Sequence, residues 1–285
     1  MQALSEKAMI QPPALKLQRA EGALRMSVKK DGVRTRLDQL RQSGCLKTFF
    51  PHSPHSALEC ILVNVSGGIA ASDRLESLFS CPARTHLILS TQGAERYQRV
   101  RDGEAPSQVT TICHVGAGAQ LEWLPRETLY YNDAYVTRNF EVHLTADARF
   151  TSVETRVFGR SYAGERVQRL RLKERMCVYR DGAPLFIDAV ISDAISDAVL
   201  DRAAIGDGAH VQQSILHVSD EATICLDEVR TAIRGVNHVH MAASAWNGVM
   251  VIRLLARHLD HALKAGEAAL KVVRRGADMP PSWRY

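Results

Sequence analysis

Closely spaced turn signals divide most of the sequence into pieces of strand length, and this spacing limits the fold more than any other feature. Asp-Gly dipeptides, which are typical of tight turns, mark corners at residues 31–32, 102–103, 181–182 and 207–208. Runs rich in Val, Ile, Thr, Leu and Phe lie between such corners, for example 58-LECILVN-64, 86-HLILST-91 and 108-QVTTICHV-115. The pattern predicts a mainly β protein, built as a sandwich, a barrel or a β-solenoid of stacked sheets rather than from βαβ units.

Three segments depart from the β pattern. Residues 1–14 are polar and contain a Pro-Pro pair, so we expect a flexible tail there. Residues 192–208 predict a short helix, capped by Ser192 or Asp193 and ended by Gly206. Residues 248–277 carry a helical pattern that Gly266 is expected to divide into two helices. We therefore expect a single domain over 15–285, β-rich over 15–243 and helical over 248–277.

Composition and charge exclude several classes of protein. The net charge of +5 is spread along the chain, whereas nucleic-acid binding needs clustered Lys and Arg with interleaved aromatic residues. No stretch approaches the roughly 20 consecutive apolar residues of a membrane span. The six cysteines include no C-x-x-C pair, so we expect free thiols in a reducing cytoplasm.

A search for catalytic motifs finds none. The sequence lacks G-x-x-x-x-G-K-[ST], G-x-G-x-x-G, G-x-S-x-G and H-E-x-x-H. Glu122 and Glu127, in 119-AQLEWLPRETLYY-131, leave open an all-β carbohydrate-active enzyme that uses two carboxylates. They are equally explained as hydrogen-bonded residues of a strand and its corner.

Histidine pairs leave open a stand-alone nickel-binding protein. His238 and His240 would face the same side of a strand, and His258 and His261 would be neighbours on a helix. Imidazole is a good ligand for nickel. Two ligands make an incomplete site, however, and a structural role explains each pair as well.

Two long stretches carry a resemblance to a known family. They are 64-NVSGGIAASDRLESLFSCPARTHLILSTQGAERYQR-99 and 121-LEWLPRETLYYNDAYVTRNFEVHLTADARFTSVETRVFGRSYAGE-165. The family's ordered motif residues are Asn64, Gly67, Gly68, Asp73, Thr91, Gln92, Glu122, Pro125, Glu127, Gly159, Arg160, Gly164 and Glu165. In this order the motifs resemble the urease accessory protein UreD family, called UreH in some bacteria.

The chain departs from that family at one turn and at one corner. Val65-Ser66 stands where the family usually has Pro-Pro, and Ala71-Ser72 stands where glycines usually precede the Asp. Both changes make the turn less rigid and less tolerant of unusual backbone angles. Arg126 replaces a common Gln. The acidic residues of the motifs are kept.

The resemblance implies a fold and a role without catalysis. It implies a β-helix-like fold with helices near the C-terminus. It also implies binding to the urease apoprotein and to the accessory proteins UreF and UreG, the second of which is a GTPase. Nickel(II) is then cargo in transit to the urease active site, through an internal passage, and no cofactor is held tightly.

The resemblance also suggests residues for each part of this role. The candidates for the lining of the passage are Asp73, Glu95, Glu122, Glu127, Glu154, Glu165, His114 and His143. The polar and turn residues expected beside it are Thr91, Gln92, Gly67 and Gly68. The candidates for partner docking are Arg253, Arg257, Trp283 and Tyr285.

Overall fold

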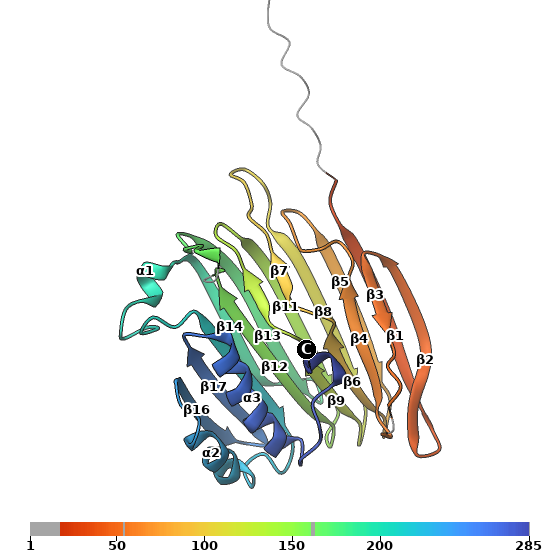
Figure 1. Ribbon diagram of the computed structural model, residues 1–285. Helices are drawn as coiled ribbons and strands as arrows, with labels where there is room; N and C mark the ends of the chain where they lie inside the picture. The colour runs from red at the N-terminus through yellow and green to blue at the C-terminus, as the bar shows by residue number, and fades with distance from the viewer. Residues whose placement is uncertain (1–17, 54, 161–162, 285) are drawn as a thin grey trace, which may run out of the picture.

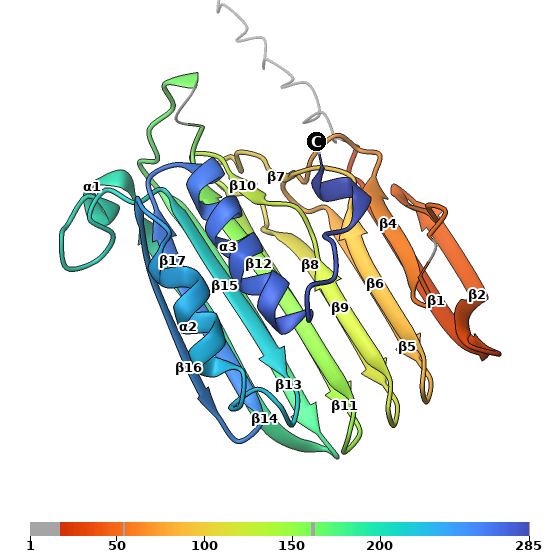
Figure 2. The same ribbon diagram turned by 60° about the horizontal axis from the view of Figure 1, so that its bottom comes forward.

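The computed structural model describes residues 18–53, 55–160 and 163–284 (Figure 1). The tail expected over residues 1–14 lies outside this range, as does Tyr285. The described chain forms two large β-sheets packed face to face, with helices against the outer face of one of them (Figures 1 and 2). A mainly β fold with helices toward the C-terminus, as the sequence predicts, is confirmed.

The two sheets are named here sheet A and sheet B. The strand order of sheet A is β14 (Ala183–Ile195), β13 (Leu170–Arg180), β11 (Tyr135–Leu144), β8 (Ser107–Val115), β5 (Arg74–Cys81), β1 (Glu21–Asp31) and β2 (Arg34–Gly44). The strand order of sheet B is β16 (Val239–Trp246), β17 (Val249–Ala256), β15 (Val211–Val218), β12 (Arg149–Phe158), β9 (Gln120–Leu124), β6 (His86–Thr91), β4 (Leu58–Asn64) and β3 (Leu46–Phe49). Two short strands, β7 (Glu95–Tyr97) and β10 (Thr128–Tyr130), extend sheet B beside β12.

The central strands wind as a flattened β-solenoid. Between β4 and β13 the long strands alternate between sheet B and sheet A along the chain, and within each sheet they pair in parallel. Antiparallel pairs such as β1–β2, β13–β14 and β15–β17 close the two ends of the coil. Of the three architectures that the sequence leaves open, the β-solenoid is therefore the one observed.

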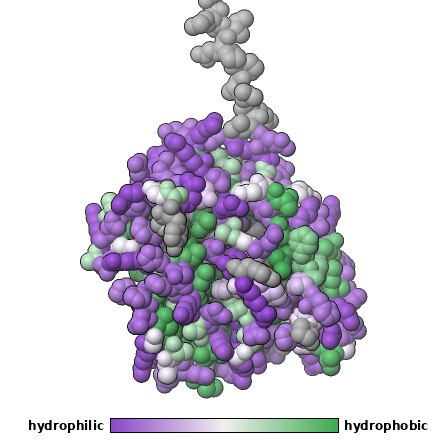
Figure 3. Space-filling model, in the orientation of Figure 1, coloured by the Kyte–Doolittle hydropathy of each residue, from purple (hydrophilic) through white to green (hydrophobic). Residues whose placement is uncertain are grey.

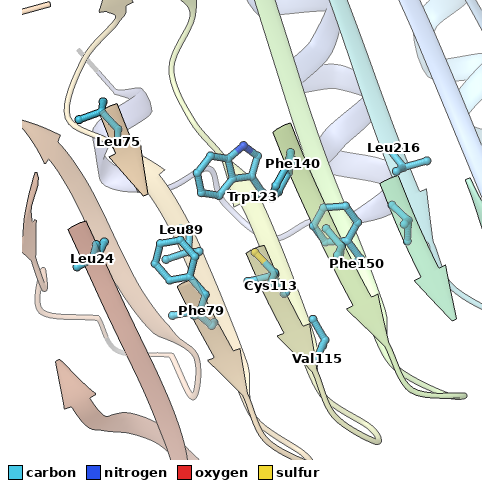
Figure 4. Close-up of a cluster of buried hydrophobic side chains, with 14 of the residues drawn as sticks. Leu24, Leu75, Phe79, Leu89, Cys113, Val115, Trp123, Phe140, Phe150 and Leu216 are labelled. Carbon is cyan, nitrogen blue, oxygen red and sulfur yellow. The ribbon is translucent and has the colours of Figure 1, made fainter. Parts of the chain in front are cut away.

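The main apolar core fills the space between the sheets (Figure 4). Side chains of a strand alternate between its faces, so Leu121 and Trp123 of β9 point inward and meet Phe140 from sheet A. Phe79 of β5 packs on the other side of Trp123, with ring centroids 6.3 Å apart. This core fixes the spacing of the sheets and hence the shape of the cavities between them.

Helices cover the outer face of sheet B (Figure 2). Helix α3 (Leu259–Val273) and helix α2 (Leu226–Arg234) bury Ala269, Leu270 and Val229 against Ile215 and Ile252 of the sheet. The C-terminal segment, with the 3₁₀ turn η2 (Pro281–Trp283), lies along the same face. Within the described residues, none of the helices has the length and apolar character needed to cross a membrane.

The prediction of a helical segment over 248–277 is wrong in its first part. Residues 249–256 form β17, which is sandwiched between the core and the helices, so apolar residues occupy both of its faces. A continuous apolar run of this kind does not distinguish a strand from a helix. Gly266 does not divide α3 either, because the helix runs through it.

The prediction of a helix over 192–208 is also largely wrong. Strand β14 continues to Ile195, and the helix α1 (Asp197–Leu200) is a single turn that begins after Ser196. Asp197 is buried and accepts a hydrogen bond from the backbone N–H of Val167 at 3.1 Å. Because of this tertiary contact, the helix starts later than Ser192 or Asp193. A local capping pattern alone cannot reveal such a contact.

Candidate functional site

A large cavity lies between the sheets at the end of the coil that carries β3 and β4. Its volume is about 610 Å³, and strands from both sheets contribute to its wall. Polar or small residues form much of the lining, including Asn64, Gly67, Gly68, Thr91, Gln92, Gly93, Glu95, Thr111, Thr128 and Arg138. Thr91, Gln92, Gly67, Gly68 and Glu95 therefore line one cavity together, and their place beside a metal passage stays a prediction.

A second, narrow cavity lies farther along the same inter-sheet space. Its volume is only about 30 Å³, and its wall is formed by β11 to β15 and β17. Its polar lining residues are Arg138, Ser152, Glu154, Arg156, Glu174, Arg175, Asp188 and Ser214. Of the described residues that line these two cavities, only Arg138 lines both. Together the cavities follow the axis of the coil, interrupted at this side chain.

Ion pairs join the two sheets where the cavities meet. Arg138 donates from Nη2 to Glu154 Oε1 at 2.7 Å, and its Nη1 lies 2.5 Å from Glu154 Oε2, so the pair is bidentate. Arg156 donates from Nε to Glu174 Oε2 at 2.7 Å. The forked Arg138–Glu154 pair is of a kind that is geometrically specific and strong. They hold β11 and β13 of sheet A against β12 of sheet B.

Aromatic side chains complete the hydrogen bonding of these carboxylates. Trp123 Nε1 donates to Glu154 Oε1 at 3.0 Å, and the hydroxyl of Tyr130 donates to Glu174 Oε1. Tyr97 stacks on Tyr130 with ring centroids 5.3 Å apart. The carboxylates are thus fixed in place rather than free to rotate, which defines the positions of their oxygens.

The environment changes the pKa values of this group in opposite directions. Burial raises the pKa of the Glu95 carboxyl, and the nearby Arg138 charge only partly opposes this. Burial acts the same way on Glu174, but there Arg156 and Arg138 outweigh it and hold the pKa below its usual value. Burial disfavours the Arg138 cation, yet Glu154 and Glu174 keep its pKa above the usual range. The site therefore combines fixed charges with one carboxyl whose pKa is raised by burial.

Comparison with known proteins decides the family. The profile of the UreD urease accessory protein family matches residues 20–284. The chain is 35% identical to the urease accessory protein UreD of Roseobacter denitrificans, over 93% of this chain and 95% of that protein. It is 33% identical to UreD of Azorhizobium caulinodans, over 93% of this chain and 97% of the relative. The chain belongs to the UreD urease accessory protein family. The resemblance seen in the sequence is confirmed.

The UreD family turn at residues 64–68 forms without its usual prolines. Ser66 replaces a proline and donates from its backbone N–H to Asn64 Oδ1 at 3.0 Å, and its hydroxyl donates to the carbonyl of Gly68 at 2.7 Å. Gly67 has a φ of +78°, a conformation that favours glycine. Hydrogen bonds thus hold the backbone of this turn, which rigid prolines would hold in the family pattern.

Asp73 supports the turn and does not line the described cavities. Its carboxylate accepts hydrogen bonds from the backbone N–H groups of Ala20 and Ala70, both at 2.7 Å. Ser72, where the family usually has glycine, adopts a φ of +64°. The left-handed backbone explains why glycine is favoured there. The structure gives Asp73 a role in holding β1 to the turn.

Thr91 also has structural partners although it lines the large cavity. Its hydroxyl donates to the carbonyl of Gly93 at 3.0 Å and accepts from the backbone N–H of Arg126 at 2.9 Å. These contacts join the end of β6 to the corner after β9. The wall of the large cavity is therefore held in shape by its own lining.

Glu122 faces away from the inter-sheet space. It is the neighbour of inward-pointing Trp123, so strand alternation places it on the outer face of sheet B. There it is buried and forms ion pairs with Arg274 and with His86, whose Nε2 lies 2.7 Å from Oε1. Although burial acts to raise its pKa, His86 and Arg274 hold the Glu122 pKa below its usual value. Glu122 attaches the end of α3 to the sheet.

Glu127 and Glu165 pair with arginines next to them in the sequence or in the same loop. Glu127 Oε2 lies 3.3 Å from Arg126 Nε, and Glu165 accepts from Arg160 Nε at 3.1 Å. Neither glutamate is among the lining residues of the two cavities. Of the predicted carboxylates, Glu95 and Glu154 are thus the two that reach the cavities.

The predicted histidines lie elsewhere. His114 and His143 are partly or fully exposed on sheet A, where their rings lie 5.0 Å apart and His143 stacks on Tyr179 at 5.1 Å. His238 precedes β16 and lies 5.0 Å from His261 in ring centroids, so it does not form the strand pair expected with His240. Within the described residues, no group of three or more His, Cys, Asp or Glu is arranged to hold a metal ion.

The residues expected to dock partners have partners inside the chain. Arg253 donates to Asp188 Oδ1 at 2.9 Å, and Arg257 donates to the carbonyl of Asp207 at 3.0 Å. Trp283 Nε1 donates to the carbonyl of Leu124 at 2.9 Å, so the C-terminal segment docks on its own sheet. Tyr285 lies outside the described residues.

Sequence reasoning missed three residues at the centre of the site: Arg138, Arg156 and Glu174. A signal for them exists in the strand alternation. Arg138 follows Val136 and precedes Phe140 on the inward face of β11, and both of those neighbours are buried. A charged residue in such an apolar register must find a partner across the core, which is the observation that could have found the whole cluster.

Proposed function

We propose that this UreD family member is a non-catalytic scaffold for nickel delivery to urease. In this role it binds the urease apoprotein together with UreF and UreG, and the inter-sheet cavities form the route of Ni²⁺. The observation that carries the proposal is that two cavities lie in the inter-sheet space and share one lining residue, Arg138, which is paired with carboxylates from both sheets. This arrangement fits a conduit better than a surface ion site.

The chemistry of the lining supports passage rather than storage. A transported ion must be bound well enough to enter and weakly enough to leave. The large cavity offers Glu95 together with neutral oxygens such as those of Gln92 and Thr111. Such oxygen ligands hold Ni²⁺ less tightly than a cluster of imidazoles.

The division of labour with partners follows from what the sequence contains. It has no G-x-x-x-x-G-K-[ST] loop, so in this proposal UreG supplies GTP hydrolysis. Exposed apolar side chains gather on the side of the molecule that carries β3 and β4 (Figure 3). Phe49 and Val65 are both 60% exposed there; Val65 directly follows the cavity residue Asn64, and Phe49 lies at the other end of β3, opposite Ile61. Exposed apolar residues are typical of protein contacts, and Val65 is the one beside the large cavity.

The experiment compares matched carboxylate variants in cells that produce urease with its accessory proteins. Glu95→Gln keeps the size of the side chain and removes the charge from the large cavity. We expect urease that is made at normal levels but contains less nickel, with UreF and UreG still recovered together with the tagged chain. Glu76→Gln, at an exposed position of β5, is the control and is expected to leave nickel content unchanged.

Normal nickel content in the Glu95→Gln and Glu154→Gln cells would contradict the route through the interior. Normal nickel content after deletion of the gene would contradict the delivery role as a whole. The alternative of a carbohydrate-active enzyme gains no support from the site, because Glu122 is engaged with Arg274 on the outer face of sheet B.

A further inference from the structure

Arg138 occupies the junction of the two cavities. Its side chain is 11% exposed and crosses the inter-sheet space from β11 to β12, where it forms the bidentate pair with Glu154. The same guanidinium lies 3.9 Å from Glu174, measured from Nη1 to Oε1. Because Arg138 lines both cavities, an ion moving between them meets this side chain.

The guanidinium is the positive charge that several carboxylates share. Glu154 and Glu174 contact it directly, and Glu95 lies in the same cavity wall and feels its charge. Arg156 pairs with Glu174 from the narrow cavity and does not line the large one. Without Arg138, the carboxylates would face one another across the junction with one positive charge too few.

We propose that Arg138 is a cationic plug, which occupies the position that a divalent cation takes during passage between the cavities. The cation and the guanidinium then compete for the oxygens of Glu154 and Glu174, so the route is closed when Arg138 is in place. This role depends on the route proposed above, but it concerns one residue and can fail alone.

Space and charge determine how the plug opens. The narrow cavity, at about 30 Å³, offers far less room for a displaced guanidinium than the large cavity, at about 610 Å³. Arg138 therefore swings toward the large cavity and Glu95. An unpaired buried carboxylate is strongly unfavourable, so Arg138 leaves Glu154 only as a divalent cation takes its place.

In the wild-type interior the guanidinium of Arg138 pairs with Glu154 and lies 3.9 Å from Glu174. Among the described residues, no three His, Cys, Asp or Glu side chains are grouped to hold a metal ion. Removing the guanidinium while keeping its aliphatic stem should therefore create a cation site.

The test measures Ni²⁺ binding by the purified full chain, using equilibrium dialysis and metal analysis. We expect Arg138→Met to bind one more Ni²⁺ per chain than wild type. Its apparent Kd for Ni²⁺ should be lower than that of wild type by about tenfold or more, which corresponds to roughly 1.4 kcal/mol of binding free energy. Adding Glu154→Gln to this variant should abolish the gain, because a ligand is lost. Circular dichroism and thermal unfolding report whether each variant is folded.

Arg156→Met is the matched control. This variant also removes one buried guanidinium, and it takes from Glu174 its partner Arg156. Because Arg138 still fills the junction, we expect no additional Ni²⁺ to bind. Equal uptake by both Met variants would overturn the plug and indicate a general effect of excess negative charge. Arg138→Lys keeps the charge without the fork and should bind Ni²⁺ to an intermediate degree.

The outcomes separate the plug from the route. Arg138→Lys binding no more Ni²⁺ than wild type overturns the plug, even if Arg138→Met does not fold. Failure of Arg138→Met to bind Ni²⁺, alongside reduced urease nickel in Glu95→Gln cells, overturns the plug and keeps the route. Ni²⁺ uptake by Arg138→Met with normal urease nickel in those cells would show that the guanidinium occupies a cation position, but it would overturn the plug together with the route that it closes.

Discussion

At the scale of single residues, His217 of β15 provides a measurable link between pH and stability. It is buried, hydrogen-bonded to Thr151 at 2.9 Å between Oγ1 and Nδ1, and burial lowers its pKa to about 4. The unfolded chain, with a His pKa of about 6.5, binds more protons between these values. We therefore expect the free energy of unfolding to fall as pH decreases from about 6.5 to 4, by up to about 3 kcal/mol from this group.

Urea unfolding at a series of pH values measures this effect. His217→Asn keeps a group that can hydrogen-bond to Thr151 but does not titrate, so its stability should fall less over the same range. His55→Asn, at an exposed position, should follow the wild-type curve. If the free energy of unfolding of His217→Asn depends on pH as that of wild type does, the assignment of the effect to His217 is contradicted. Measurements above pH 4.5 avoid the separate loss of stability that is expected as Glu122 becomes protonated.

The sequence could identify single site residues where they share a local motif. The family motifs suggest Gly67, Gly68, Thr91 and Gln92 beside a passage; all four line the large cavity, and that this cavity is a passage stays a prediction. Glu122 was predicted there too, yet it faces α3. The face of β9 on which Glu122 lies depends on which of its neighbours points into the core, and the side chain of adjacent Trp123 points inward. Local composition does not reveal that choice.

At the scale of elements, Gly266 shows how the contact between a helix and a strand determines which type of residue fits at a position. A Cβ at this position of α3 would lie 2.0 Å from Gln213 Oε1 of β15. Ala is the better helix former, but the clash outweighs that advantage. We expect Gly266→Ala to destabilise the protein by about 1–3 kcal/mol, as overpacking commonly does, measured by denaturant unfolding.

Two further variants make this test specific. A Cβ on Gly235, just after α2, would meet nothing within 4 Å, so Gly235→Ala should be neutral or stabilise by up to about 1 kcal/mol. Combining Gly266→Ala with Gln213→Ala should reduce the effect of the first change, because the clashing amide is gone. Additive losses in the double variant would show that Gln213 is not the cause.

Elements were predictable where turn signals bound a short run of strand-forming residues, and less so where an apolar run is long and continuous. The strands over 58–64, 86–91 and 108–115 were recognised from their composition and flanking turns, and the structure has them as β4, β6 and β8. β17 was read as helix because its apolar run is continuous. The helix α2 was not predicted, since its buried face is limited to Val229 and Ile233.

At the scale of the whole molecule, the cysteines report on global opening. All six are free thiols, and Cys225 is the one that is not buried. Burial raises the pKa of Cys60 and of Cys81 to about 12, which removes the reactive thiolate at ordinary pH. We expect a thiol reagent at pH 8 to label a single cysteine in the native protein and all six in denaturant.

Cys225→Ser serves as the control for this count and should leave the native protein unlabelled. Rapid labelling of further thiols without denaturant would mean that the sheets open locally, and it would contradict a tightly packed coil. The sequence indicated free thiols correctly from their spacing, but their burial depends on strand register, which no cysteine pattern contains.

The solenoid also sets a length. Neighbouring strands in a sheet lie about 4.8 Å apart, and the two cavities extend across the strands rather than along them. In the route proposed above, the distance between entrance and exit is therefore a whole number of strand spacings. A relative with one more turn of the coil would have these two points farther apart by that single step, and no intermediate distance would be possible. The antiparallel strands at either end limit the coil, so the number of turns would set the distance between the partners at its two ends.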